Sequence, residues 1–334
     1  MGFSIIVPFK NEEDKLPDLI AHLKNIHYPL KEFEVIFVDD GSSDSSVKIL
    51  QAAIDKSFYP VMRLLTTRES SGLSGKKMAI HTGVSNARYE YIITIDADCT
   101  MGSHWLQTYA TYISENHPDM IIGPVEMVST GSLLSDYFAL EFSSLVGSAF
   151  GAARIGMPVM CNGANLVYRK ETYERVGGFS GNLQYASGDD VFLLHKFKKL
   201  PEARIHPLKS PGALVYTNTP KSFGQFFRQR KRWSAKSLGY TDSATLWVGG
   251  TVAAFSLSIA AGIVAGIFSP QIFKIALLAL VVKIIVDFPL LWMVLGFTRR
   301  RLLLWLYPSL AVLYPFYVSC TLAIAILPFR GWKK

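Results

Sequence analysis

The chain has 334 residues, half of them hydrophobic, and its 34 basic and 26 acidic residues give a net charge of +8. This length suits one large domain or two moderate ones. Basic residues cluster at 221–236 and 299–301 beside apolar stretches, so the expected partners are membrane lipids and phosphate groups, with no nucleic acid. The three cysteines lie far apart with no CxxC pair, which indicates neither a disulfide framework nor a zinc site.

Short apolar, β-branched runs alternate with helical patterns in the first hundred residues. The runs at 3–8, 34–38 and 91–95 are typical of strands, and a helical pattern at 76–87 precedes the third. This alternation predicts βαβ units in an α/β fold with a mostly parallel sheet. The first strand begins at once, with no signal-peptide pattern, so we expect the N-terminal half to stay in the cytosol.

Acidic residues follow two of these runs directly. Asp39 and Asp40 come after the second run, and Asp96 and Asp98 come after the third. Ligands of parallel sheets bind beyond the carboxyl ends of the strands, so these carboxylates are expected to converge on one binding edge. The Asp96-Ala97-Asp98 triplet alone is equally typical of turn or capping aspartates. Beside a second acidic pair it favours a Mg²⁺ or Mn²⁺ site, because these ions take one or two carboxylates plus phosphate oxygens.

A glycine-rich turn at 72–77 precedes the predicted helix. Lys77 stands where a P-loop would have Ser or Thr, so this is not a P-loop, although Lys76 at a helix start can still hold a phosphate. No GxGxxG follows the first strand, so a dinucleotide cofactor is not expected.

Residues 132–153 carry apolar positions at helical spacing and few charges. Two alternatives remain open for this helix: an ordinary core helix, or an amphipathic helix in the membrane interface.

Ser187-Gly188-Asp189-Asp190 opens another helical run. One interpretation is an N-cap with acidic first-turn residues. The other is a general base at the helix start, because adjacent like charges raise the pKa of one carboxyl group.

Gln229, Arg232 and Trp233 stand at i, i+3 and i+4 of a predicted helix and so share one face. An amide, a guanidinium fork and a flat ring suit a diphosphate next to a sugar or lipid acceptor. The alternative is that the basic residues here are only the cytoplasmic flank of a membrane helix.

Three long apolar stretches follow, at 246–268, 271–297 and 302–327, and predict a membrane domain of about three segments over 246–328. Pro308 and Pro315 are expected to kink the last one. Lys283 and Asp287 lie four residues apart in the second, where we expect an ion pair facing neighbouring helices, or else separate side chains that reach the interface.

Together these motifs resemble the inverting family 2 glycosyltransferases, which include cellulose, hyaluronan and poly-N-acetylglucosamine synthases and many lipid-linked sugar transferases. The matching motifs cover roughly residues 3–235 and are Val7-Pro8, Asn11-Glu12, Val38 to Ser42, Gly75-Lys76, Asp96 to Asp98, Asn162 to Asn165, Gly177 to Phe179, Gly188 to Asp190 and Gln229 to Trp233. The resemblance implies a GT-A fold over a cytosolic domain at 1–240, and a nucleoside diphosphate sugar donor, usually a UDP sugar.

The resemblance also implies roles for the site residues. Asp190 would be the catalytic base, Asp98 would ligate the metal, and Asp189 and Trp233 would lie at the acceptor. In this family Glu often precedes the base, and here Asp189 replaces it, so the role of Asp189 is the least defined. The nucleotide-sugar site would be formed by Pro8, Glu12, Asp39, Asp40, Lys76, Asp96, Gln229 and Arg232.

Three functions fit this pattern. The first, which we favour, is transfer of one sugar to a lipid-linked or glycan acceptor by a multi-pass enzyme of the cell inner (plasma) membrane. The second is a processive polysaccharide synthase, and the third a non-catalytic nucleotide-sugar-binding scaffold in the membrane. The donor sugar, the acceptor and the oligomeric state are not specified by the sequence.

Overall fold

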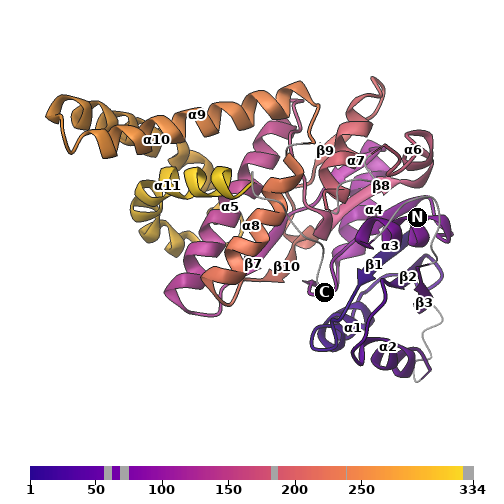
Figure 1. The fold of residues 1–334 in the computed structure, drawn as a ribbon. Coiled ribbons are helices and arrows are strands. Elements are labelled where there is room, and N and C mark those ends of the chain that lie inside the picture. Colours follow the sequence, from indigo (N-terminus) through magenta and orange to yellow (C-terminus); the bar gives the residue numbers. More distant parts are fainter. Residues whose placement is uncertain (56–61, 68–74, 182–186, 238, 326–334) are drawn as a thin grey trace. The chain divides into compact units, whose positions relative to one another are not determined.

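The computed structural model of the protein describes all residues except 56–61, 68–74, 182–186, 238 and 326–334 (Figure 1). Part of the glycine-rich turn, Gly72 to Ser74, therefore lies outside the described residues. By its contacts the chain divides into two units. Within the described residues the first comprises Met1–Glu126 and Ala152–Asn218, and the second comprises Met127–Gly151 and the chain from Thr219 onward.

The first unit is built around a seven-stranded sheet in the order β3-β2-β1-β4-β8-β6-β9. The first four strands in this order are parallel to one another, β8 is antiparallel to β4 and β6, and β9 is parallel to β6. The strands are β1 (Phe3–Phe9), β2 (Phe33–Asp39), β3 (Met62–Thr66), β4 (Tyr91–Thr94), β6 (Met120–Ile122), β8 (Leu166–Arg169) and β9 (Ile205–Pro207). The predicted α/β fold with a mostly parallel sheet is confirmed.

The central strands are mostly apolar because helices cover both faces of the sheet. Every residue of β1 and β2 is buried, and Ile5 pairs with Val35 in register. Gly83 lets α3 approach β1 closely, since a Cβ there would lie 2.5 Å from Cγ2 of Ile6. The helices of this unit are α1 (Leu16–Lys24), α2 (Ser46–Asp55), α3 (Gly75–Ser85), α4 (Trp105–Asn116), α6 (Lys170–Arg175) and α7 (Asp189–Lys198).

The strand order reverses between β1 and β4, and this reversal defines where a ligand binds. The chain passes outward from β1 to β2 and β3, then returns to place β4 on the other side of β1. The crevice beyond the carboxyl ends of β1 and β4 is the usual ligand site of such a sheet.

Pro8 is tolerated inside β1 because the β4 pairing stops at Ile6, so its missing N–H deprives no partner strand of a hydrogen bond.

A second, three-stranded sheet has the order β5-β10-β7. Its strands are β5 (Thr100–Met101), β10 (Val215–Asn218) and β7 (Val125–Val128), the last of which runs across the boundary of the two units. Tyr216 of β10 pairs with Thr100, two residues after the acidic triplet.

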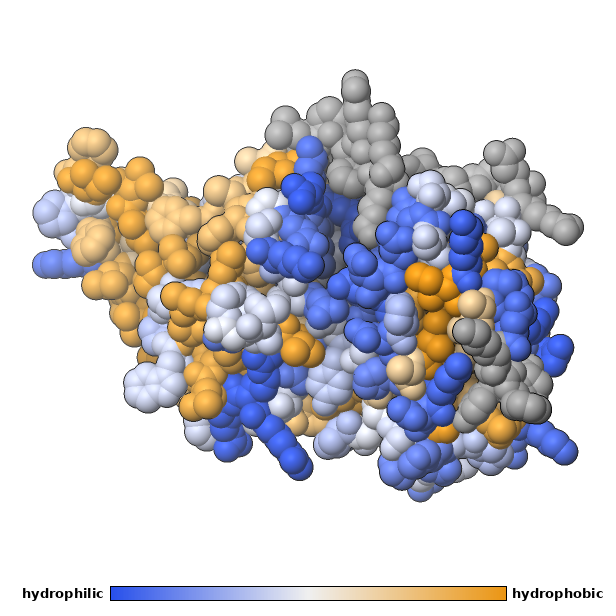
Figure 2. All heavy atoms as spheres, turned by 90° about the horizontal axis from the view of Figure 1, so that it is seen from below, coloured by the Kyte–Doolittle hydropathy of each residue, from blue (hydrophilic) through white to orange (hydrophobic). Residues whose placement is uncertain are grey.

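The second unit consists of helices. They are α5 (Leu133–Arg154, apart from its last turn), α8 (Phe223–Ser237), α9 (Ser243–Ala265), α10 (Pro270–Phe297), the 3-10 helix η3 (Arg301–Leu306) and α11 (Tyr307–Ala325). Three segments, α9, α10 and Arg301–Ile324, are long and apolar enough to cross a membrane. Their exposed apolar side chains dominate the orange area at the left of Figure 2. The expectation of three apolar C-terminal helices is confirmed.

Local signals explain where these helices begin. Asp242 caps α9, with its Oδ2 accepting from the Thr245 N–H at 2.9 Å. Pro308 is the second residue of α11, directly after η3, where its missing N–H costs no helical hydrogen bond, and a kink there stays a prediction. Pro315 does lie inside α11.

Lys283 and Asp287 form the predicted ion pair within α10. The Lys283 ammonium also lies 4.6 Å from the centre of the Tyr314 ring, which belongs to α11. The pair therefore faces a neighbouring helix, and the alternative of two independent side chains is wrong.

The predicted helix at 132–153 corresponds to α5. Its apolar positions Phe138 and Phe142 are buried, and Phe138 stacks on Phe226 of α8 at 4.2 Å between ring centres. Close approach of α10 requires Gly147, since a Cβ there would lie 2.7 Å from Val294. Contact of α5 with the bilayer stays a prediction, as does a cytosolic domain ending at residue 240. In their contacts, α5 and α8 group with the apolar helices.

Candidate active site

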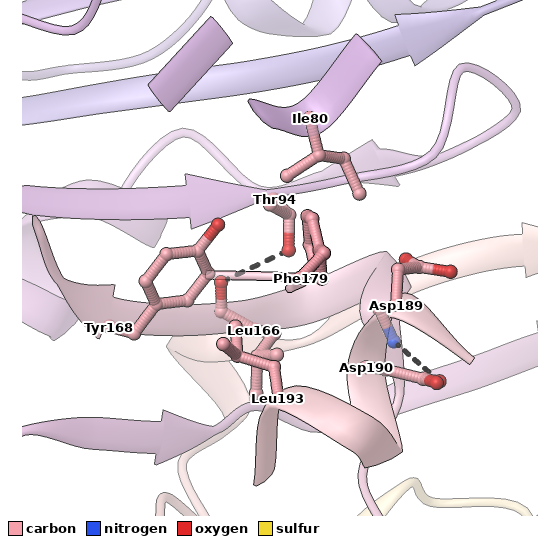
Figure 3. A pocket seen from close by; sticks show the side chains of 9 residues that line it. Ile80, Thr94, Leu166, Tyr168, Phe179, Asp189, Asp190 and Leu193 are labelled. Carbon is pink, nitrogen blue, oxygen red and sulfur yellow. Dashed lines mark hydrogen bonds between the residues drawn. The ribbon is translucent and has the colours of Figure 1, made fainter. Parts of the chain in front are cut away.

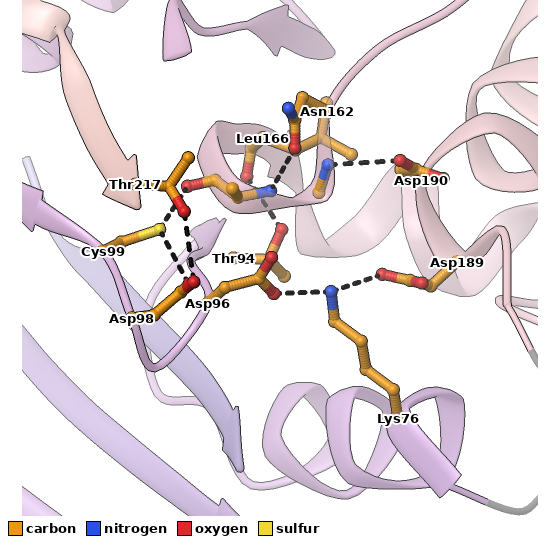
Figure 4. Close-up of polar contacts among 12 residues, drawn as sticks. Lys76, Thr94, Asp96, Asp98, Cys99, Asn162, Leu166, Asp189, Asp190 and Thr217 are labelled. Carbon is orange, nitrogen blue, oxygen red and sulfur yellow. Dashed lines mark hydrogen bonds and ion pairs between the residues drawn. The ribbon is translucent and has the colours of Figure 1, made fainter. Parts of the chain in front are cut away.

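Lys76 joins two groups of carboxylates at the predicted edge of the sheet (Figure 4). Its Nζ lies 2.6 Å from Oδ1 of Asp96, beyond β4, and 3.4 Å from Oδ2 of Asp189, at the start of α7. Burial alone would lower the pKa of Lys76, but Asp189, Asp96 and Asp190 outweigh it and raise that pKa. The ammonium group is thus held charged, and it fixes the loop after β4 to the first turn of α7.

Asp98 lies in a more enclosed and more acidic place than Asp96. Burial, with the nearby negative charges of Asp96 and Glu12, raises the pKa of Asp98 to about 6. Its Oδ2 accepts a hydrogen bond from the Thr217 hydroxyl of β10 at 3.1 Å. Negative charge around Asp98, at an energetic cost to the ionised form of this carboxyl group, makes an environment that favours a cation.

The two acidic residues at the start of α7 differ in exposure. The Asp189 side chain is 10% exposed and faces Lys76. Asp190 is half-buried, and its Oδ2 accepts from the Gly163 N–H at 3.3 Å. A side chain at Gly163 would crowd this place, because its Cβ would lie 3.1 Å from Oδ2 of Asp189. Of the pair, Asp190 therefore has the carboxylate that a substrate can more readily reach.

A narrow pocket with no room for a water molecule lies beside these two residues (Figure 3). Ile80, Phe179 and Leu193 contribute apolar side chains to its walls. Ligand pockets usually measure about 300–1,000 Å³, so a pocket that does not admit a water molecule cannot hold a nucleotide sugar. Its apolar side chains instead pack beside Asp189 and Asp190.

The loops after β1 and β2 are bound to each other. Asn11, in the left-handed region at φ 54°, accepts from the Ser43 N–H at 2.8 Å, and its own N–H donates to the Ser42 hydroxyl. Asp39 is buried and accepts from the Ser42 N–H at 2.9 Å. Burial raises the pKa of Asp40, against the opposing effect of Lys10. The loops after β1 and β2 are thus fixed to each other, and together they are called the double loop. The residues of this region that are predicted to bind the nucleotide lie in it or at its start.

The sequence assigned no role to two residues that position the site, although Asn165 belongs to one of the matching motifs. Thr217 reaches Asp98 from 119 positions away. Asn165 is fully buried, and its amide donates to the Pro124 and Ala213 carbonyls at 2.9 and 2.8 Å, while Tyr109 donates to its Oδ1. Asn165 ends the short 3-10 helix η1 (Gly163–Asn165), so its bonds fix the segment whose Gly163 meets Asp190.

The acidic groups suit a divalent cation in number and in kind. Within the described part of the chain no cluster of three or more His, Cys, Asp or Glu side chains is preformed as a metal cage. Mg²⁺ and Mn²⁺ do not need such a cage, since one or two carboxylates with substrate phosphates and water complete their shell. Asp98 and Asp96 fit that requirement.

The Gln229–Trp233 segment lies on α8 in the second unit. Gln229, Arg232 and Trp233 are half-buried. Arg230 instead is buried, forms an ion pair with Glu141 of α5, and lies 4.2 Å over the Trp233 ring. The alternative in which all the basic residues here form one solvated flank is therefore wrong for Arg230.

Comparison with known proteins is consistent with this arrangement. The family described as "Glycosyl transferase family 2" matches residues 4–176, and "Glycosyl transferase family group 2" matches residues 91–330. In fold, the chain is similar to a mannosyltransferase from Pyrobaculum calidifontis solved with GDP-Man and Mn²⁺, with a TM-score of 0.59 and 17% identity over 97% of this chain and 86% of that one.

Two curated relatives illustrate the range of activities. A poly-beta-1,6-N-acetyl-D-glucosamine synthase of Staphylococcus epidermidis is 23% identical over 70% of this chain and 54% of its own length. An undecaprenyl-phosphate 4-deoxy-4-formamido-L-arabinose transferase of Pseudomonas fluorescens is 41% identical over 28% of this chain and 27% of its length. The chain thus spans about half, or less, of these relatives.

Proposed function

Because this chain belongs to glycosyl transferase family 2, we propose that it is an inverting glycosyltransferase of the inner (plasma) membrane, with its catalytic residues in the cytosol. It moves one sugar from a nucleoside diphosphate sugar, with UDP as the nucleotide, to a lipid-linked or glycan acceptor in the membrane. One observation carries the proposal: Lys76 holds Asp96, beyond β4, close to the acidic start of α7. This contact supports a proposal in which the carboxylates that bind the donor and the carboxylate that acts as the base lie in one place.

The base in this proposal is Asp190. Its half-buried carboxylate takes the proton of the acceptor hydroxyl, whose oxygen forms the new bond to the anomeric carbon while the bond to the diphosphate breaks on the opposite side. Asp189 acts through Lys76, because it is buried and paired with it. The Gly163 N–H and the fixed start of α7 orient Asp190 for this attack.

The leaving diphosphate is stabilised by positive charge. Asp98 and Asp96 would hold a Mg²⁺ or Mn²⁺ ion, which when bound neutralises charge on the diphosphate. On this view Glu12, Asp39 and Asp40 of the double loop beyond β1 receive the nucleotide. Gln229 and Arg232 bind the diphosphate, and Trp233 contacts the acceptor.

A second candidate is a processive polysaccharide synthase. The similarity to the Staphylococcus epidermidis synthase over 70% of this chain supports it. The similarity to the undecaprenyl-phosphate transferase supports single transfer, over a shorter stretch. A non-catalytic scaffold would have no use for an oriented base such as Asp190.

Product size separates the candidates. The purified chain in lipid bilayers would be incubated with a panel of radiolabelled nucleotide sugars, Mg²⁺ or Mn²⁺ and lipid extract, with Asp190→Asn as the matched inactive control. We expect one shifted lipid product that disappears with the control variant. A ladder of products would establish the synthase, and donor binding without turnover for every sugar would establish the scaffold.

A further inference from the structure

A groove of about 540 Å³ in the second unit lies where α10 ends and η3 begins. Leu302 and Trp305 are 82% and 85% exposed, so apolar surface is presented to the surroundings here instead of being packed inside. The principal side chains of its walls are Phe288, Trp292, Arg299, Arg301, Leu302 and Trp305.

The three consecutive arginines at this turn have different surroundings. Arg300 donates to the Met127 carbonyl at 2.9 Å and lies 3.7 Å from Asp136. Arg301 stacks over the Trp292 ring at 4.4 Å. Arg299 and Arg301 both line the groove, and among the described residues neither has a carboxylate within 4 Å. The groove thus combines aromatic walls with two guanidinium groups that no described acidic side chain neutralises.

Arg299 also has an unusual backbone. Its φ is 59°, in the left-handed region, and it closes the C-terminus of α10. The Arg299 N–H bonds to the Gly296 carbonyl at 3.3 Å, and the Arg300 N–H bonds to the Leu295 carbonyl at 2.8 Å. Glycine is the usual residue at the left-handed position of this motif, and any other side chain there is disfavoured. An arginine at a place that favours glycine points to a task for its side chain.

We propose that this groove binds an anionic phospholipid of the bilayer. The phosphate lies between the guanidinium groups of Arg299 and Arg301, and an acyl chain lies along Trp292 and Leu302. Since α10 is long and apolar enough to cross a membrane, its end lies at the depth of the lipid head groups. Arginine forks bind phosphate, basic pockets beside membrane helices bind acidic head groups, and tryptophan is favoured at this depth. A soluble phosphate would leave the exposed apolar walls unused.

This proposal does not depend on the catalytic one, because it concerns the second unit only and its test measures binding. Melting of the full chain in detergent would be followed during titration with phosphatidylglycerol or phosphatidylcholine. We expect phosphatidylglycerol to raise the melting temperature of the wild type and phosphatidylcholine to leave it nearly unchanged. Arg301→Gln should weaken the apparent affinity for phosphatidylglycerol at least about tenfold, as the loss of one charged hydrogen bond implies.

The decisive variant is Arg299→Gly. It removes the guanidinium and suits the left-handed backbone, so it should melt at or above the wild-type temperature without lipid and yet lose affinity for phosphatidylglycerol about tenfold. Lys274→Gln is the matched control, because it removes an exposed positive charge from the first turns of the same helix.

Four outcomes would overturn the proposal. They are an unchanged phosphatidylglycerol response in Arg299→Gly, an equal loss in Lys274→Gln, equal stabilisation by inorganic phosphate alone, and preferential binding of a polyprenyl phosphate. The third would make the groove a soluble-anion site, and the fourth an acceptor site.

Discussion

The Arg230 guanidinium of α8 and the Glu141 carboxylate of α5 form an ion pair buried inside the second unit, with side chains only 4% and 3% exposed. The Tyr317 hydroxyl of α11 donates a further hydrogen bond to Glu141 at 3.0 Å. Arg230 also lies over the rings of Phe226 and Trp233, at 4.6 and 4.2 Å. This pair fixes the rotation of α8, and therefore the direction in which the Gln229–Trp233 motif faces.

Glu141→Ala is expected to destabilise the protein by about 3–5 kcal/mol, because it leaves a buried guanidinium without its counter-charge. Replacing both partners, as Glu141→Leu with Arg230→Met, should recover at least half of that loss. The matched control is Asp136→Ala on the same helix, whose partly exposed pair with Arg300 should contribute at most about 1 kcal/mol. Thermal unfolding in detergent measures all three. A double variant less stable than Glu141→Ala would contradict this role.

Asp98→Asn should abolish metal-dependent turnover without unfolding the protein. The raised pKa of Asp98 shows that its ionised form is disfavoured in the fold, so stability decreases as pH rises from the ordinary aspartate value of 3.8 towards about 6. Removing the charge should therefore leave the melting temperature equal or higher at neutral pH without metal. Activity and melting would be measured against added Mn²⁺, with Glu90→Gln at the other end of β4 as the control. Full activity of Asp98→Asn in excess chelator would remove the metal from the reaction.

Asp190→Asn should lower kcat by about 10²–10⁴ while leaving donor affinity nearly unchanged, since a general base acts in the transition state. Asp189→Asn should behave differently, because it deprives buried Lys76 of one counter-charge and so lowers the melting temperature as well. Donor binding by calorimetry, turnover and melting separate the two. If donor binding disappears in Asp190→Asn, that residue belongs to the pocket and is not the base.

Arg232→Lys should reduce turnover markedly although it keeps the charge, because an ammonium cannot reproduce the bidentate fork of a guanidinium on a diphosphate. The matched control is Arg228→Lys, one turn earlier on α8 and exposed, which should be nearly neutral. Arg230 is unsuitable as a control because of its pair with Glu141. Equal, mild effects of both lysine variants would favour a purely electrostatic flank.

The fold was largely predictable from short stretches of sequence. β1, β2 and β4 are apolar runs that differ plainly from their surroundings, and the three apolar helices exceed the thickness of a bilayer in length. The strands β6 and β9 have three residues each, too few to show the alternating pattern of a strand. No strand was predicted from the sequence at β8. These strands form because of the sheet beside them and do not carry a signal of their own.

The site could be predicted as a set of residues, but not as a set of contacts. Asp39, Asp40, Asp96 and Asp98 were expected at one edge because parallel strands end at the same side of a sheet. That Lys76 lies between carboxylates, instead of facing outward for a phosphate, was not expected. Ion-pair partners that lie about twenty or a hundred positions apart produce no repeating pattern in the sequence from which their contact could be predicted.

The hydrophobic period and the apolar length of each element are thus present in the sequence. They were enough to predict the α/β sheet, its acidic edge and the helices that could cross a membrane. Tertiary structure alone decided which polar side chains meet: Thr217 with Asp98, Asn165 with two loops, and Arg230 with Glu141. The physical reason is desolvation. Four neighbouring basic residues of α8 have much the same intrinsic preference for water, and only the packing of α5 and α11 selects the one that is buried and supplies its counter-charge.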